Sequence, residues 1–282
     1  MVFLTECFGI IQMTIAELFE YTFIRYALIA GVLAAVACGI IGAFVVTRRI
    51  VSIAGGIAHA SFGGIGIAAF FGISPILPAL SFGALSGILL SLLGKKKGSL
   101  SEDTGVGILW ATGMSIGVLF LSLSKGYAGD LFAYLFGNIL TVTIRDLIGL
   151  AILDTGIILL IFSFFKELLS ISFDEEFAEA RGLPVLILQI ILFFAIALTV
   201  VVLMKIVGII LVIAMLTLPS ATAKRFASSI KKLILYGIAV ALVDIAIGLL
   251  LAFRFDLPAG ASSVLVATAL FLLAQIVPRP LH

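Results

Sequence analysis

Long apolar stretches separated by short charged groups dominate the chain. A helix needs about 20 predominantly apolar residues to cross a hydrocarbon core of roughly 30 Å. The pattern therefore predicts an all-α integral membrane protein, a polytopic helical bundle of eight or nine spans. The count stays open because the second and third stretches follow each other closely. The predicted spans are residues 25–47, 53–72, 75–93, 104–124, 144–165, 184–204, 206–223, 233–253 and 259–277.

Two shorter apolar segments do not fit a span. Residues 1–20 carry glutamates within an apolar run, which indicates an amphipathic interfacial helix on the membrane surface. Residues 130–140 are too short to cross, and their pattern is typical of a re-entrant or interfacial helix. With these additions we expect a single transmembrane domain over residues 1–282.

The composition supports this class. Of the 282 residues, 63% are hydrophobic and 11% are charged, against about 25% charged in soluble domains. A soluble globule could not cover so much apolar surface with so few polar groups. We therefore expect a multi-pass protein of the cell membrane. The net charge of +2 does not indicate a nucleic-acid partner.

Basic residues predict the orientation of the spans, because cytoplasmic loops carry an excess of Lys and Arg. They gather after the first, third, fifth, seventh and ninth predicted spans. This bias places the N-terminus outside the cell and the loop around residues 172–183 in the cytoplasm. The residues concerned are Arg48, Arg49, Lys95, Lys96, Lys97, Lys166, Arg181, Lys224, Arg225, Lys231, Lys232 and Arg279.

His59 is one of three ionisable residues inside the predicted spans, where such groups are costly and face a cavity or a partner. It lies about 15 Å along the helix from Arg49, close to the middle of the membrane. Glycines at helical spacing share its face and would let another helix approach closely. A neutral imidazole there could contact a transition metal or form an interhelical hydrogen bond. The glycines are Gly55, Gly56, Gly63 and Gly66.

Asp154 and Asp244 are the other two ionisable residues in the spans. An intramembrane carboxylate can be an oxygen ligand for a metal, a proton relay or a partner for another polar group. A structural role, or a position near the membrane interface, is the alternative for each. Both are weak metal candidates.

The segment 172–184 predicts a helix of about two turns. Ser172 or Asp174 can cap its start, and Gly182 followed by Pro184 favours its end. Isolated helices shorter than about 12–15 residues are marginal in water. The predicted helix must therefore pack on its own membrane domain or dock another protein.

Two further features of this segment bear on docking. Glu175 and Glu176, with Asp174, suit the positive end of the helix dipole. Phe173 and Phe177 are spaced one turn apart, which places both on one face in need of a surface to cover.

Several motifs of enzymes are absent from the sequence. It contains no phosphate loop of the form Gly-x-x-x-x-Gly-Lys-Ser/Thr, no Gly-x-Ser-x-Gly turn and no His-Glu-x-x-His. We expect no enzyme activity in this chain. If transport is driven by ATP, the motor must be a separate chain.

Six patches, in order along residues 20–277, together resemble the membrane permeases of ATP-binding-cassette importers for zinc, manganese or iron. They include the end of the first span, the second-span histidine, and the pattern Ser-Glu-Asp-Thr before the fourth span. The six are residues 42–49, His59-Ala60, 101–108, 135–140, 173–182 and 207–223.

The resemblance implies the fold of the cobalamin and siderophore importer permeases. It also implies a homodimer with two cytoplasmic ATP-binding subunits and an extracytoplasmic metal-binding protein. A divalent metal would pass His59 at the dimer axis. ATP would be used by the partner subunits, with no cofactor bound by this chain. The loop 172–183 would be the coupling helix that inserts into the ATPase, through Phe173, Asp174, Glu175, Glu176, Phe177, Ala178 and Gly182.

One position departs from the family. Its members commonly carry an aspartate four residues before this histidine, where the present chain has Gly55. Two alternatives remain open: Asp154 or Asp244 supplies the carboxylate, or the metal travels as a chelate. An alternative function is a proton-coupled secondary metal transporter or exporter that titrates His59 and the two aspartates.

Overall fold

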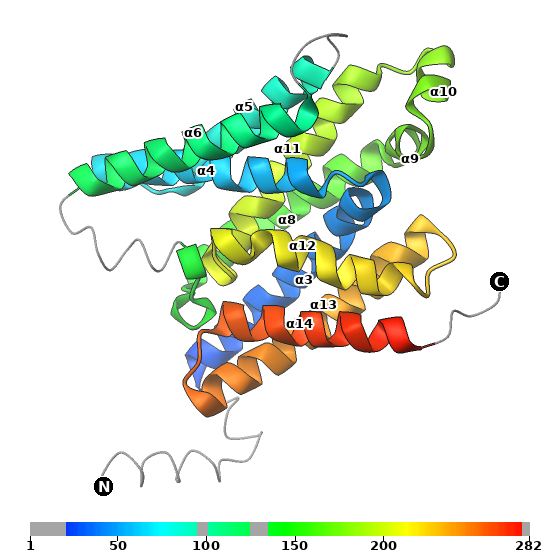
Figure 1. The fold of residues 1–282 in the computed structure, drawn as a ribbon. Helices are drawn as coiled ribbons and strands as arrows, with labels where there is room; N and C mark the ends of the chain where they lie inside the picture. The colour runs from blue at the N-terminus through cyan, green and yellow to red at the C-terminus, as the bar shows by residue number, and fades with distance from the viewer. Residues whose placement is uncertain (1–20, 95–100, 125–134, 278–282) are drawn as a thin grey trace, which may run out of the picture.

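The computed structural model describes residues 21–94, 101–124 and 135–277. All regular secondary structure in these ranges is helical (Figure 1). The predicted interfacial helix of residues 1–20 lies outside the described residues. The prediction of an all-helical membrane bundle is confirmed.

Eight helices in the described ranges are long and apolar enough to cross a membrane. Each matches one of the predicted spans within a few residues. They are α3 (Thr22–Arg48), α4 (Val51–Phe71), α5 (Ile76–Gly94), α6 (Glu102–Leu123), α8 (Ile144–Ser163), α11 (Val185–Ile206), α13 (Ile230–Phe255) and α14 (Ala259–Ile276).

The remaining predicted span, residues 206–223, corresponds to the shorter helix α12 (Ile209–Lys224), which has 16 residues. It begins directly after Gly208, whose φ of +84° places it in the left-handed region. A Cβ on Gly208 would lie 2.3 Å from the carbonyl carbon of Phe136. Only glycine fits this crossing of two backbones, so the turn between α11 and α12 is fixed at this point.

Residues 135–140 do not form the single short helix expected. Gly137 has a φ of +69° and interrupts it. The chain then makes a 3₁₀ helix, η1 (Ile139–Thr141). Asn138 caps the start of this helix, because its side-chain oxygen accepts a hydrogen bond from the amide of Leu140. The rest of the predicted 130–140 helix lies outside the described part of the chain.

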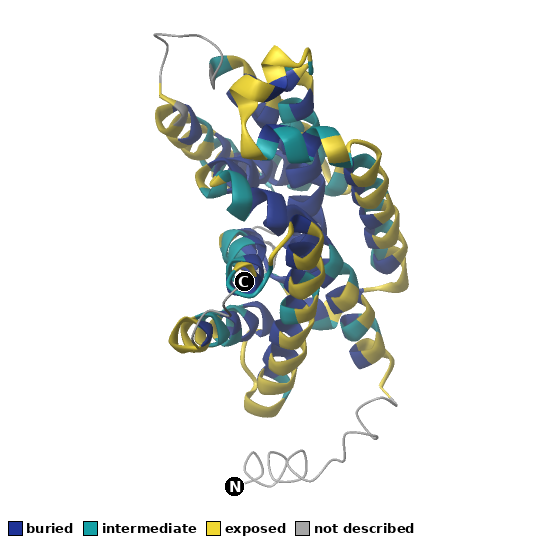
Figure 2. Cartoon of the chain, turned by 90° about the vertical axis from the view of Figure 1, so that its right-hand side faces the viewer, coloured by how far each residue is buried: buried dark blue, intermediate teal, exposed yellow. Residues whose placement is uncertain are grey.

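Helix α3 is the centre of the bundle. It packs against α8, α11, α12 and α13, and Figure 1 shows α4, α5 and α6 on one flank and α13 and α14 on the other. Many of its residues are small and fully buried, which lets neighbouring helices approach closely. A Cβ on Gly39 would lie 2.5 Å from the backbone nitrogen of Ile238 in α13. Figure 2 shows this buried core surrounded by helices with exposed outer faces.

Candidate functional site

His59 lies in α4 and is 6% exposed. Its imidazole stacks on the indole of Trp110 in α6, with ring centroids 3.9 Å apart and an interplanar angle of 12°. The Nδ1 atom is buried and has no hydrogen-bond partner within the described residues. His59 is therefore covered by protein, as the glycines around it indicated, and the indole that covers it is itself 39% exposed.

Helices α4 and α6 approach each other closely on the C-terminal side of this pair. A Cβ on Gly113 of α6 would lie 2.4 Å from the Cα of Ala60. A Cβ on Gly66 of α4 would lie 2.3 Å from the carbonyl oxygen of Gly117. The predicted close approach along the glycine face is confirmed, and it fixes the positions of the two stacked rings.

Gly55 lies one turn before His59. A Cβ at this position would lie 2.8 Å from Cδ1 of Ile213 in α12 and 3.7 Å from Cζ3 of Trp110. The space next to His59 on this turn is therefore filled by an aliphatic and an aromatic side chain from other helices.

The sequence interpretation missed Trp110. It is the one tryptophan of the chain, but no local pattern links it to His59, because the two rings come from different helices. Its rarity in an apolar span was the only signal available.

Asp154 and Asp244 are buried in α8 and α13, at 3% and 0% exposure. Neither carboxylate has a hydrogen-bond partner within residues 21–94, 101–124 and 135–277. Both helices pack against α3, which carries the buried Cys38. Both carboxylates therefore lie inside the helical bundle.

The three ionisable residues do not form one metal centre. In the part of the chain that the structure describes, no three His, Cys, Asp or Glu side chains are grouped closely enough to hold a metal ion. Any metal at His59 must therefore receive its other ligands from outside this set, such as water, a chelator or a second protein chain.

The predicted 172–183 helix is built differently from the expectation. Helix α9 (Phe165–Phe173) comes first, and Asp174 then adopts an extended conformation before α10 (Glu175–Ala180). Phe173 and Phe177 thus belong to two helices and do not share one helical face, which corrects the prediction. Both are exposed, at 74% and 56%.

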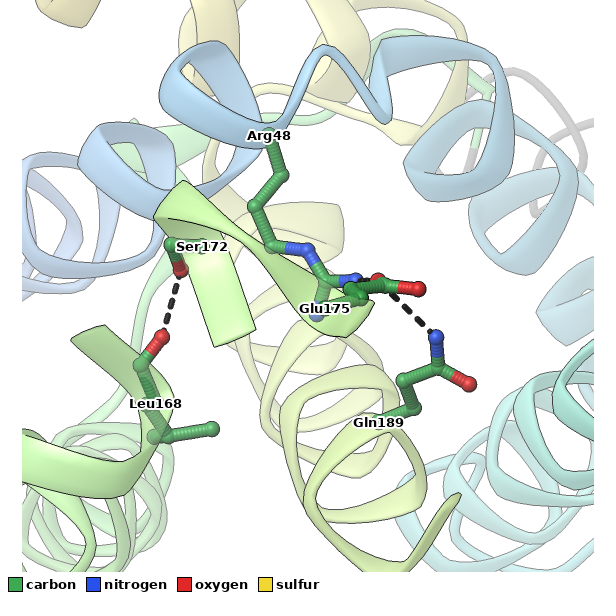
Figure 3. Close-up of polar contacts among 5 residues, drawn as sticks. All are labelled: Arg48, Leu168, Ser172, Glu175 and Gln189. Atoms are coloured by element: carbon green, nitrogen blue, oxygen red, sulfur yellow. Dashed lines mark hydrogen bonds and ion pairs between the residues drawn. The ribbon is translucent and has the colours of Figure 1, made fainter. Parts of the chain in front are cut away.

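Of the two possible caps, Asp174 is the one used. Its carboxylate accepts a hydrogen bond of 2.9 Å from the amide of Phe177. Ser172 instead donates to the carbonyl oxygen of Leu168 within α9, at 2.6 Å (Figure 3). Gly182 ends the segment in the left-handed region, with a φ of +79°. Ala178 is the fully buried residue of α10.

Glu175 faces its own chain. Its carboxylate is ion-paired with Arg48 at the end of α3 and accepts a hydrogen bond of 3.0 Å from Gln189 of α11 (Figure 3). A cavity of about 710 Å³ lies beside this contact, lined by Arg49, Glu176 and other residues. Glu176 and Glu179 are exposed.

Further basic residues tie helix ends together at this same end of the bundle, which we call the basic end. Lys224 of α12 donates to the carbonyl oxygen of Val46 in α3 at 3.3 Å. The Arg225 guanidinium donates to carbonyl oxygens of Gln275 and Val277 at the end of α14. Carbonyls at helix C-termini lack intrahelical partners, so these cations both satisfy them and hold the helix ends in place.

The chain is similar to known proteins over nearly its whole length. Residues 20–278 match the ABC 3 transport family. The chain is 41% identical over 255 residues to the uncharacterized membrane protein slr2045 of Synechocystis, covering 90% of each. It is 34% identical to the manganese import system permease protein ScaB of Streptococcus gordonii, covering 94% of each. The solved structure of PsaBC from Streptococcus pneumoniae in complex with Fab superimposes with a TM-score of 0.86 at 32% identity, over 94% of this chain and 97% of that one.

Proposed function

This chain belongs to the ABC 3 transport family and is the permease of a metal importer, and we propose that it forms the translocation path for zinc, manganese or iron while separate ATP-binding subunits supply the energy. The permease itself is a transport protein and performs no covalent chemistry. ATP would be consumed by its partners in the cytoplasm. An extracytoplasmic metal-binding protein would deliver the divalent cation.

The observation that carries the coupling part of this proposal is the shape of α10. Six residues are too few for a stable isolated helix, yet α10 has a side-chain cap, a buried alanine and an ion pair to the bundle. This support leaves Phe177 and Glu176 exposed at the basic end, which we place in the cytoplasm. An exposed aromatic beside carboxylates is a surface suited to another protein.

A homodimer is supported by the outer face of α6. This helix exposes Thr112, Ser115 and Ser122, and a shallow, open depression on the same face is lined by Met114, Ser115, Val118, Leu119 and Ser122. Small and hydroxyl-bearing residues are typical of helix contacts inside membranes, where they allow close packing and hydrogen bonds. A second copy on this face would bring two His59–Trp110 pairs toward a common axis.

In this arrangement His59 would be the main protein ligand along the path. ATP binding would close the two ATPase subunits and move α10, and the attached helices would switch the path between outward and inward access. Each half of the dimer would provide one imidazole to the passing cation.

A proton-coupled transporter is the competing function. It is favoured by one observation, the two buried carboxylates of Asp154 and Asp244 without hydrogen-bond partners in the described ranges. Such groups inside membranes often belong to proton relays. A proton-coupled transporter requires no second chain and no nucleotide.

Stimulation of the cognate ATPase by the permease tests the docking role of α10. We expect Phe177→Ala to weaken copurification of the ATPase and to reduce stimulated ATP hydrolysis about tenfold or more. Phe162→Ala is the matched control, because Phe162 in α8 is also 56% exposed and its loss should leave stimulation unchanged. Equal effects of both variants would refute docking through α10.

A further inference from the structure

The immediate surroundings of His59 contain an unusual combination of groups. One face of its imidazole is covered by the Trp110 indole at 3.9 Å. The preceding turn presents Gly55, and the space beside it is taken by Ile213 and by the edge of the same indole. Within the described residues, no three potential metal ligands are grouped together. The neighbours of the imidazole are therefore aromatic and aliphatic side chains.

The type of ligand decides which divalent ion such a site favours. Carboxylate, carbonyl and water oxygens suit Mn²⁺, whereas imidazole suits Zn²⁺, Cu and Fe. For a given nitrogen site, affinity rises from Mn²⁺ to a maximum at Cu²⁺, and Zn²⁺ still binds more tightly than Mn²⁺. A site with an imidazole and no adjacent carboxylate thus discriminates against Mn²⁺.

We propose that Trp110 and Ile213 determine the specificity of the transit site, which binds Zn²⁺ through the imidazole of His59 in preference to Mn²⁺. The two side chains occupy the space that a carboxylate side chain at residue 55 would enter. This inference rests on the importer function proposed above and selects among the metals it allows.

Trp110 has a second part in this arrangement, as a positioning residue for His59. A stacked ring restrains the plane of the imidazole but leaves the unprotonated ring nitrogen, whose lone pair lies in that plane, free to bind. The backbone contact between Gly113 and Ala60 keeps the indole in register with the imidazole. Metal binding at His59 must consequently alter the environment of the indole.

The single tryptophan provides a direct binding assay. We expect ZnCl₂ to change the emission of Trp110 in the purified full-length chain at concentrations about tenfold or more below those of MnCl₂. His59→Ala should abolish the response. A response to Mn²⁺ at equal or lower concentration, or one that persists in His59→Ala, would overturn the assignment.

Uptake by the complete transporter, with its ATPase, tests selectivity. Gly55→Asp combined with Ile213→Ala adds a carboxylate and the room for it, and we expect the ratio of Zn²⁺ to Mn²⁺ uptake to fall about tenfold. Gly55→Val combined with Ile213→Ala, which returns an aliphatic side chain to the same space without adding a ligand, should keep the ratio of the unmodified protein. An unchanged ratio in the double variant would overturn the inference.

Different results would refute the zinc assignment and the importer function. ATP-dependent uptake of Mn²⁺ in preference to Zn²⁺ by the unmodified transporter would overturn the zinc assignment and leave the importer function standing. Absence of ATP-dependent uptake of either ion would overturn both.

Discussion

Arg48, the last residue of α3, is ion-paired with Glu175, the first residue of α10, across 127 positions of sequence. The Arg48 side chain is only 6% exposed, so the pair lies at the edge of the packed bundle. Gln189 of α11 bonds to the same carboxylate. The short helix is thereby fastened to the central span and to the span that follows it, and we expect movement of α10 to be passed to both.

The first prediction concerns this link. Arg48→Gln would leave the Glu175 carboxylate without its cation, so α10 would still dock but would move independently of α3. We expect the number of metal ions transported per ATP hydrolysed to fall several-fold, with ATP hydrolysis largely retained. Removing one member of a fully buried ion pair costs about 3–5 kcal/mol. The cost is lower here because the Glu175 side chain is 45% exposed.

Two variants control for simple loss of stability. The exchanged pair Arg48→Glu with Glu175→Arg should recover much of the coupling, since the opposite charges are restored. Lys231→Gln removes an exposed charge at the start of α13 and should leave the stoichiometry unaffected. Coupling that survives in Arg48→Gln would show that α10 acts through another contact.

The Asp174 cap gives a second prediction. Asp174→Ala removes the acceptor for the Phe177 amide and should destabilise α10 by about 1 kcal/mol. Faster amide exchange at Phe177 and Ala178, measured by mass spectrometry, is the expected result. Ser172→Ala is the matched control, because that hydroxyl bonds within α9. Identical exchange in the two variants would contradict the assignment of the cap.

The contact between α4 and α6 gives a third prediction. Gly113→Ala places a methyl group against the backbone of Ala60, which cannot move aside as a flexible side chain would. Overpacking of this kind typically costs about 1–3 kcal/mol. We expect a lower unfolding temperature in detergent and a changed Trp110 emission. Gly156→Ala in α8, where a Cβ meets nothing within 4 Å, should be neutral or slightly stabilising.

A fourth prediction separates the two transport classes. Asp154→Asn and Asp244→Asn preserve side-chain shape but cannot carry a proton. If ATP drives transport, both variants should retain uptake within about twofold, because burying a neutral amide is less costly than burying a charge. Uptake assays with a protonophore provide the comparison. Loss of uptake in the variants, together with sensitivity to the protonophore, would instead favour the proton-coupled alternative.

The sequence predicted the spans because bilayer crossing imposes a local rule on length and hydropathy. That rule holds even for α3, where the residues are mostly small. It is weaker for α12, which is shortened by a crossing of two glycine-bearing segments, Phe136–Gly137 and Val207–Gly208. Such a crossing depends on residues far apart in the chain and leaves no periodic pattern.

The candidate sites were predictable only in part. Local capping chemistry pointed to Asp174 and Gly182, and the glycine pattern placed His59 against another helix. The extended conformation of Asp174 was not foreseen, so Phe173 was assigned to the wrong helix. The partners of His59 and Glu175, namely Trp110 and Arg48, come from other helices and could not be read from local spacing.

The most direct test of the account is metal accumulation in liposomes that contain the permease with its ATPase. We expect uphill uptake of the divalent metal only when both chains and ATP are present, and none from the permease alone under an imposed proton gradient. Uphill uptake by the permease alone, without nucleotide, would contradict the claim that this chain is moved by a separate ATP-driven subunit.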